Sequence, residues 1–184
     1  MPEQNKGPKG VVPPAERIAA SAIARLNTET PIIWLVSGPS SKKRGDLTNK
    51  IAKYFQKSAI IDGESISKYV LEGRVLPGEE PDTESERQIE LSIRNQCLLA
   101  RSFSEAGFVS VINYAILTSY HLDAYRHYLS GGELHLAVIP TNELKFLELN
   151  SLLKKELHGI GYWVKEIRTD ASITKLIESK KSIL

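Results

Sequence analysis

Hydrophobic residues along the chain fall into short continuous runs that alternate with longer amphipathic stretches. The first run covers residues 32–36 and ends at a Ser-Gly-Pro turn, a pattern typical of a strand buried on both faces of a sheet. Similar runs predict further strands at Ser58–Ile61, Phe108–Ile112, Leu134–Ile139 and Tyr162–Val164. A helix-like segment follows each of these strand-like segments.

Between the apolar runs, hydrophobic residues recur at the helical period. The longest helical segment begins at Thr83, which is expected to form a capping box with Glu86, and ends near Gly107. Its predicted buried stripe consists of Ile89, Ile93, Leu99, Ala100 and Phe103. We expect shorter helices at Asp46–Phe55, Ser65–Leu71, Ser119–Leu129, Asn142–Leu157 and Ala171–Ser179.

Strands that alternate with helices predict an α/β fold with a mostly parallel sheet. We expect about five strands, with helices on both faces of the sheet. Residues 1–13 are rich in proline and glycine, so we expect a flexible tail there. Residues 14–27 carry apolar side chains at helical spacing and predict an additional N-terminal helix. Residues 14–184 are then expected to form a single domain.

Composition and charge narrow the class of protein. The 184 residues are 41% hydrophobic and 25% charged, as in an ordinary globular domain. The sole cysteine, Cys97, is expected to be a buried small side chain, and it excludes an intrachain disulfide and a tetrathiolate zinc site. No apolar run approaches the roughly 20 residues of a membrane span, and the N-terminus lacks the apolar core of a secretory signal. We expect a soluble, cytoplasmic protein without a membrane partner.

The turn after the first predicted strand is the usual phosphate site of an open α/β sheet. A working P-loop reads G-x-x-x-x-G-K-[ST], in which glycines let backbone amides wrap the phosphates, lysine reaches the terminal phosphate and a hydroxyl binds magnesium. Counted from Gly38, this chain has Lys43 in the second glycine position, Arg44 in the lysine position and Gly45 in the hydroxyl position. The motif is therefore a degenerate Walker A sequence.

The same turn keeps a concentration of positive charge. Lys42, Lys43 and Arg44 precede a predicted helix, whose N-terminal dipole adds to their charge and favours an anion. The candidate nucleotide or phosphate ligands are Gly38, Ser40, Ser41, Lys42, Lys43, Arg44 and Gly45. The alternative interpretation is a solvated basic turn.

These features, in this order, resemble the small P-loop kinases, particularly the chloramphenicol phosphotransferase-like group of small-molecule phosphotransferases. Residues 31–55 look like the first strand, phosphate loop and first helix of that group, and Asp62-Gly63-Glu64 resembles its acidic segment near the acceptor hydroxyl. Residues 94–109 look like its long helix entering the third strand, and the likeness continues through residues 122–125 and 134–136. The resemblance covers roughly residues 31–181.

The resemblance implies an AAA-type, three-layer P-loop NTPase fold and the use of ATP with magnesium. It also implies a base at Asp62 and substrate contacts at Glu64 and Asn113. Helix capping is the simpler interpretation of Asp62, because an aspartate after a strand commonly caps the next helix.

Three parts of the chain depart from the kinase pattern. Besides the phosphate loop, Asn113 and Tyr114 follow the third predicted strand where relatives commonly carry acidic residues. The expected lid, between Pro140 and Gly161, contains lysines but no arginine. Phosphoryl transfer depends on positioning and charge stabilisation by these parts. We therefore expect a catalytically impaired kinase-like pseudoenzyme that binds an anionic ligand or, through residues 1–27, a protein partner.

Two other functions are weighed against this hypothesis. The alternative is an active ATP-dependent phosphotransferase acting on a small hydroxylated molecule, with Asp62 taking the acceptor proton. A nucleic-acid-binding module is supported only by the basic turn at residues 42–44 and an isoelectric point near 8.6. It is disfavoured because no recognition fold or aromatic platform accompanies them. The four histidines lack metal-ligand spacing, so we expect no metal site and place them at the surface or at strand edges.

Overall fold

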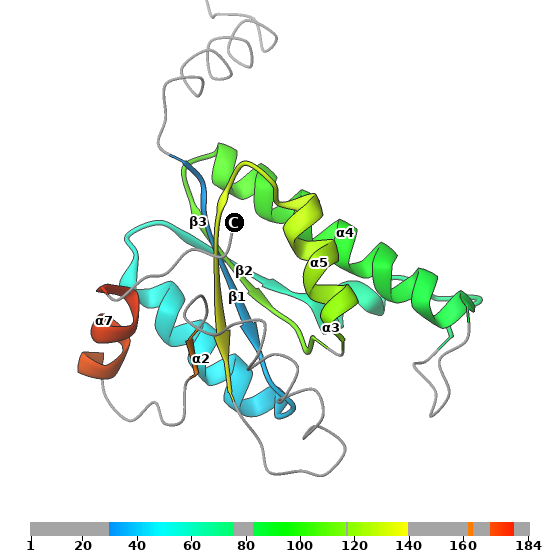
Figure 1. Cartoon of the computed structure of the whole chain (residues 1–184), viewed down its shortest axis with the longest axis horizontal. Coiled ribbons are helices and arrows are strands. Elements are labelled where there is room, and N and C mark those ends of the chain that lie inside the picture. The colour runs from blue at the N-terminus through cyan, green and yellow to red at the C-terminus, as the bar shows by residue number, and fades with distance from the viewer. Residues whose placement is uncertain (1–29, 76–82, 117, 140–161, 164–169, 179–184) are drawn as a thin grey trace, which may run out of the picture.

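The computed structural model describes residues 30–75, 83–116, 118–139, 162–163 and 170–178 (Figure 1). The predictions for the tail, for the helices at 14–27 and 142–157, for the expected lid and for His158 lie outside the described residues. None of the helices in the described ranges is long and apolar enough to cross a membrane.

A parallel sheet forms the centre of the molecule, as the alternation of strands and helices predicts. Its main strands are β1 (Ile32–Ser37), β2 (Ser58–Asp62), β3 (Val109–Asn113) and β4 (Glu133–Val138), arranged in the order β2-β3-β1-β4. A two-residue segment, β5 (Tyr162–Trp163), pairs with the end of β4. Because β1, β3 and β2 are parallel neighbours, the residues that follow these three strands emerge at one edge of the sheet.

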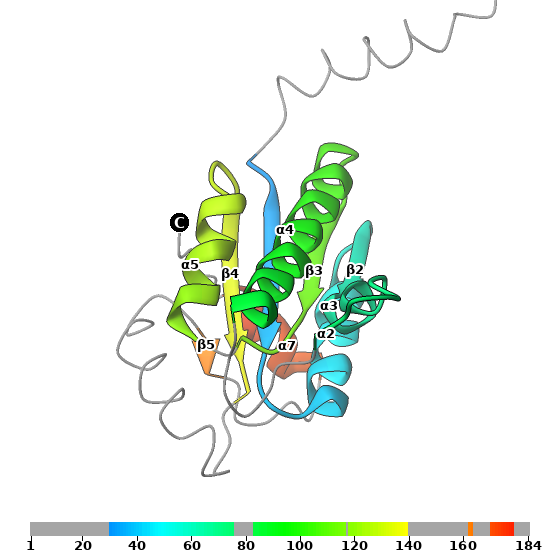
Figure 2. The same cartoon turned by 90° about the vertical axis from the view of Figure 1, so that its right-hand side faces the viewer.

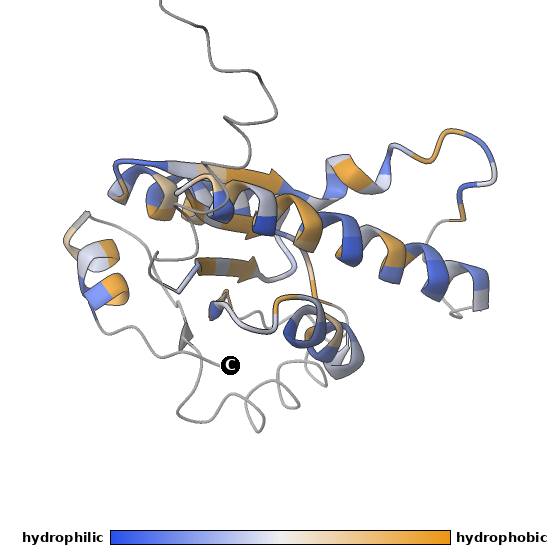
Figure 3. Cartoon of the chain, turned by 90° about the horizontal axis from the view of Figure 1, so that it is seen from above, coloured by the Kyte–Doolittle hydropathy of each residue, from blue (hydrophilic) through white to orange (hydrophobic). Residues whose placement is uncertain are grey.

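Helices cover both faces of this sheet (Figures 1 and 2). One hydrophobic core joins the sheet to α3 (Gly63–Ser67), α4 (Thr83–Glu105) and α5 (Ser119–Tyr128). A second core joins the other face to α2 (Ser41–Tyr54) and α7 (Asp170–Glu178). The expected three-layer α/β fold is therefore confirmed. Seen from above, hydrophobic residues gather on the strands between the helices (Figure 3).

Two helices begin earlier than predicted, and each begins at a polar cap. Helix α2 starts at Ser41 rather than Asp46, because the Ser40 side chain accepts a hydrogen bond from the Lys43 amide at 3.3 Å. Helix α3 covers Gly63–Ser67 rather than Ser65–Leu71, because Asp62 caps it. Side chain to backbone bonds therefore decide where both helices start.

The buried stripe of α4 is partly as predicted. Ile89, Ile93 and Ala100 are buried, whereas Leu99 and Phe103 are 41% and 38% exposed. Their places in the stripe are taken by other residues of the inward face, namely Ser92, Gln96 and Cys97. The burial of the Gln96 amide is balanced by hydrogen bonds with Tyr125 and Ser92. The position of Cys97 in the core agrees with the prediction.

Two histidines are in the core, contrary to the surface or strand-edge position expected for all four. His121 lies under α4 with its Nε2 atom 3.1 Å from a carboxylate oxygen of Glu86. Because Glu86 contacts His121 and Thr83 is already the first helical residue, the expected capping box does not form. His135 stacks on Trp34 with ring centroids 4.8 Å apart. His127 is exposed, as predicted.

Candidate functional site

The candidate site lies where three chain segments leave the same edge of the sheet. In the strand register, Asn113 at the end of β3 faces Val36 on one side and Asp62 on the other. The turn after β1, the start of α3 and the residues after β3 therefore come together. This edge is where parallel α/β sheets hold their ligands.

The turn between β1 and α2 is short and contains only Gly38, Pro39 and Ser40. Gly38 has φ of +145°, and a Cβ atom there would lie 2.7 Å from the carbonyl oxygen of Ile139. A side chain at this position would be strained and would collide with the backbone after β4. Gly38 therefore lets β1 turn sharply into α2.

The amides at the start of α2 are bonded within the helix cap. The Lys43 amide donates to the Ser40 hydroxyl, and the Arg44 amide donates to the Ser40 carbonyl oxygen at 2.9 Å. In a P-loop the corresponding backbone amides turn toward the phosphates. In this chain the early helix start directs two of them to Ser40.

Arg44 is a buried cation at the centre of the site, because its side chain is 1% exposed. Its Nη1 atom donates to the Gly38 carbonyl oxygen at 2.5 Å, and its Nε atom donates to Asn113 Oδ1 at 3.1 Å. Its Nη2 atom forms an ion pair with the Glu64 carboxylate. One guanidinium thus joins the turn after β1, the end of β3 and the start of α3.

The burial of Arg44 is a feature that the charge pattern misses. The three adjacent cations are alike in sequence, yet Lys42 and Lys43 are exposed. The inward face of α2 begins with Arg44 and continues at helical spacing through Leu47, Thr48 and Ile51. Extending the helical spacing of Ile51 and Leu47 toward the N-terminus is the sequence signal that could have predicted the burial of Arg44.

Asp62 has its carboxylate engaged in capping α3. Its Oδ1 atom accepts a hydrogen bond from the Glu64 amide at 3.2 Å, and its Oδ2 atom accepts one from the Ser65 hydroxyl at 2.6 Å. Asp62 is exposed, whereas Glu64, two residues on, points its carboxylate to Arg44. Glu64 and Asn113 therefore meet at Arg44, and Asp62 lies beside them as a cap.

The other predicted phosphate ligands lie around Arg44. Ser41 is exposed like the two lysines, whereas Gly38, Ser40 and Gly45 are half-buried. Within the ranges that the structure describes, no three His, Cys, Asp or Glu side chains gather closely enough to hold a metal ion.

Tyr114 closes the site from the side of α4. It is 8% exposed, and burial raises the pKa of its phenol, with a further rise from the negative charge of Glu64. Gly63 packs against it so closely that a Cβ atom at residue 63 would lie 2.5 Å from Tyr114 Cδ2. This close approach fixes the start of α3 and therefore the position of Glu64.

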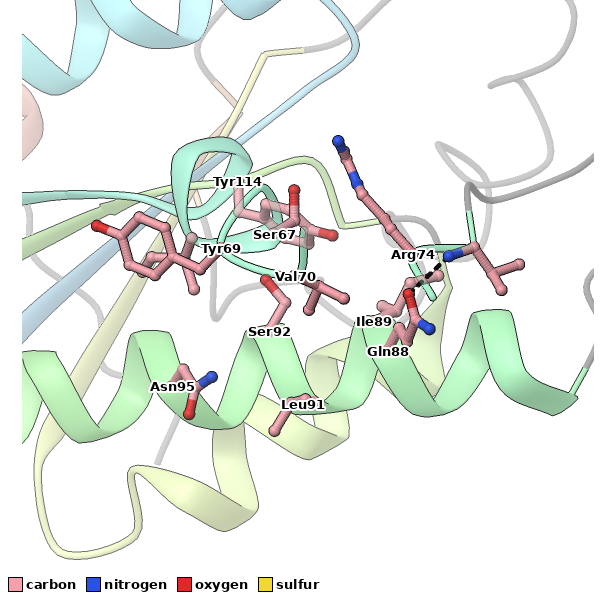
Figure 4. Close-up of a pocket in the computed structure, with 12 residues that line it drawn as sticks. Ser67, Tyr69, Val70, Arg74, Gln88, Ile89, Leu91, Ser92, Asn95 and Tyr114 are labelled. Atoms are coloured by element: carbon pink, nitrogen blue, oxygen red, sulfur yellow. Dashed lines mark hydrogen bonds between the residues drawn. The ribbon is translucent and has the colours of Figure 1, made fainter. Parts of the chain in front are cut away.

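A pocket of about 170 Å³ opens between α3 and α4, next to Tyr114 (Figure 4). Its lining includes Ile66, Val70, Ile89, Asn95 and Arg74. The carboxamide of Gln88 ties down the loop after α3, because its oxygen accepts a hydrogen bond from the Val75 amide at 2.8 Å. Apolar side chains with a few polar groups at the edge are typical of a small ligand site.

Comparisons with known proteins show the fold. No protein-family model matches the chain, and no curated protein is similar to it in sequence. Among solved structures, the APS kinase of Mycobacterium tuberculosis in complex with AMPPNP and APS is similar at a TM-score of 0.58 and 10% identity, covering 82% of this chain and 98% of that one. The protein APE1195 is similar at a TM-score of 0.56 and 16% identity, covering 83% of this chain and 95% of that one. The chain therefore shares the α/β fold of these solved structures.

Proposed function

We propose that this chain, whose fold is that of the P-loop kinases, does not transfer phosphate and acts as a binding module. The observation that supports this proposal best is the buried Arg44 guanidinium, which is bonded to Gly38, Asn113 and Glu64. Arg44 stands in the sequence position of the phosphate-binding lysine. A cation that is already neutralised inside the protein is a poor ligand for a nucleotide.

Two costs oppose a nucleotide phosphate at this turn. Arg44 would have to leave its acceptors, and breaking a buried ion pair is costly because both charges lose their partner. The Glu64 carboxylate would then lie beside the incoming phosphate and repel it. Both costs arise from the same ion pair.

The residues present also fit a magnesium nucleotide poorly. Gly45 offers no hydroxyl where the P-loop has its magnesium ligand. The Asn113 side-chain oxygen accepts from Arg44, and the Glu64 carboxylate is paired with the same side chain. The oxygen ligands that magnesium would need at this turn are therefore engaged by Arg44.

Because Arg44 and its ion-pair partner Glu64 occupy the turn, a protein partner is a better supported ligand class than a nucleotide. Apolar side chains remain at the surface around the pocket between α3 and α4, where Tyr69 is 76% exposed and Leu91 is 38% exposed. Exposed apolar groups that surround a pocket are typical of an interaction surface. A small anion held by the exposed Lys42 and Lys43 is the other ligand class that we keep.

A calorimetric titration of the full chain with ATP, with and without magnesium, tests this proposal. We expect no binding heat at millimolar nucleotide, because the Arg44 ion pair must break first. Saturable, magnesium-dependent binding that is lost in the double variant Lys43→Ala, Arg44→Ala would contradict the proposal. That result would support the active phosphotransferase, and Asp62→Asn should then abolish turnover.

A further inference from the structure

Among the residues that the structure describes, the charge that balances Arg44 comes from a single side chain. Of the three acceptors around its guanidinium, the Gly38 carbonyl and the Asn113 amide oxygen are neutral, and Glu64 alone is an anion. A fully buried cation needs such a charge, because desolvation of an unpaired guanidinium is costly. Glu64 therefore provides the electrostatic stabilisation that Arg44 needs.

Glu64 and Arg44 differ in how firmly they are enclosed. The Arg44 side chain is 1% exposed, whereas that of Glu64 is 47% exposed. Water therefore reaches the carboxylate but not the cation. The Glu64 carboxylate therefore occupies a position on Arg44 that is open to solvent, whereas the Arg44 guanidinium is enclosed by the protein.

The planar guanidinium also fits more than one kind of anion. Carboxylate and phosphate oxygens match its parallel N–H groups, and such charge-assisted bonds are stronger than neutral ones. The position that the Glu64 carboxylate occupies on the Arg44 guanidinium is therefore chemically suited to a tetrahedral oxyanion.

We infer that the Glu64 carboxylate takes the place of a phosphoryl group. It occupies an oxyanion-binding position on Arg44 and excludes other anions from it. This inference rests on the proposed function, since in a turn that bound nucleotide the anion-binding position on Arg44 would already be free. Removing the charge of Glu64 while keeping its size makes the anion-binding position on Arg44 available to free phosphate.

The test compares the full chain with two variants that each remove one negative charge. Glu64→Gln leaves Arg44 with neutral acceptors, and Glu72→Gln changes an exposed carboxylate in the loop after α3. Melting temperatures are measured against inorganic phosphate, with sodium chloride used to hold the ionic strength constant. The Glu72→Gln variant corrects for the general stabilising effect of phosphate on folded proteins.

We expect phosphate to raise the melting temperature of Glu64→Gln by about 3 to 6 °C at a tenfold excess over its dissociation constant. The unsubstituted chain and Glu72→Gln should show only a smaller, general effect of phosphate. The gain should also disappear in the double variant Arg44→Gln, Glu64→Gln. A response of Glu64→Gln no larger than that of Glu72→Gln would overturn the inference.

The test remains decisive if Glu64→Gln is unfolded in chloride alone. Phosphate should then restore its native circular dichroism spectrum, while sodium chloride at equal ionic strength should not, because a ligand of the folded state shifts the folding equilibrium. Failure of phosphate to restore the fold would overturn the inference. Magnesium-ATP binding by the unsubstituted chain would instead overturn the proposed function, so the two failures are distinguishable.

Discussion

In the proposed degenerate Walker A motif, Arg44 takes the position of the phosphate-binding lysine, yet its guanidinium lies inside the protein. Each of its three nitrogens binds an acceptor on a different chain segment, whereas a lysine has only one nitrogen to offer. The planar fork offers five N–H donors in fixed directions. An Arg in this place can therefore serve as an internal bridge between the turn, β3 and α3.

Arg44→Ala should lower the free energy of unfolding by about 2 to 4 kcal/mol, because it removes the bonds to Gly38, Asn113 and Glu64 together with buried packing. Urea denaturation measures this change. The neighbouring Lys43→Ala, at an exposed position, should stay within about 0.5 kcal/mol of the unsubstituted chain. Equal effects of the two variants would show that Arg44 does not bridge the site.

Cys97 should be inert toward iodoacetamide in the folded protein and reactive once the chain is unfolded. Burial raises the pKa of its thiol from 9.0 to about 12, with Arg101 opposing the rise, so the reactive thiolate is scarce in the native state. Mass spectrometry of the alkylated protein over time measures the rate at which iodoacetamide modifies Cys97. Rapid modification under native conditions would contradict this prediction.

The same pKa shift predicts a pH dependence of stability. A thiol whose folded pKa is raised contributes stability that is fully present below its unfolded pKa and is lost as pH rises through the folded value. The window therefore runs from about pH 9 to about pH 12. The free energy of unfolding should fall less steeply across this window in Cys97→Ala than in the unsubstituted chain.

Single residues also show the limit of prediction from sequence. The burial of Cys97 follows from its place beside apolar positions of a helix, and the prediction is confirmed. Arg44 and His121 are buried because particular acceptors, Glu64 and Glu86, reach them from elsewhere in the chain. A pattern along the chain contains no information on such distant partners.

At the scale of elements, the starts of α2 and α3 determine the form of the site. The cap at Ser40 begins α2 early, so backbone amides bond within the helix. The cap at Asp62 begins α3 directly after β2 and directs Glu64 to Arg44. The two helix starts thus bring the cation and its counter-charge together.

Two glycines at these helix starts should respond in opposite directions to alanine. Gly45 lies inside α2, and no neighbouring atom lies within 4 Å of the point that a Cβ atom would occupy, so Gly45→Ala should stabilise by about 0.5 to 1 kcal/mol through helix propensity. Gly63→Ala should destabilise by about 1 to 3 kcal/mol, because its Cβ would lie 2.5 Å from Tyr114 Cδ2. Urea denaturation compares them, and a stable Gly63→Ala would contradict the close packing of α3.

Element types are easier to predict here than element boundaries. The strands and the long helix follow from apolar runs and helical spacing, and they are present close to the expected residues. The predicted start of α2 at Asp46 is too late, because the helix begins at Ser41. The serine cap at Ser40 is a local signal that predicts the observed start.

At the scale of the whole molecule, the sheet and its two helix layers form a three-layer α/β fold, and the sequence predicts this much. The alternation of strands and helices determines the class, and β1 lies in the middle of the parallel order. The candidate site is less predictable, because its ability to bind an anion depends on whether Arg44 faces solvent or pairs with the Glu64 carboxylate. Function depends on such contacts and not on the fold.

The Nε–H signal of Arg44 in the nuclear magnetic resonance spectrum of the full, nitrogen-15-labelled chain tests the central claim most directly. Comparison with Arg44→Lys identifies the signal. We predict slow exchange with water, because this group is buried and donates to Asn113 at 3.1 Å. We also predict that millimolar magnesium-ATP leaves the signal unshifted. A rapidly exchanging Nε–H, or a saturable shift with magnesium-ATP, would contradict an internally engaged Arg44.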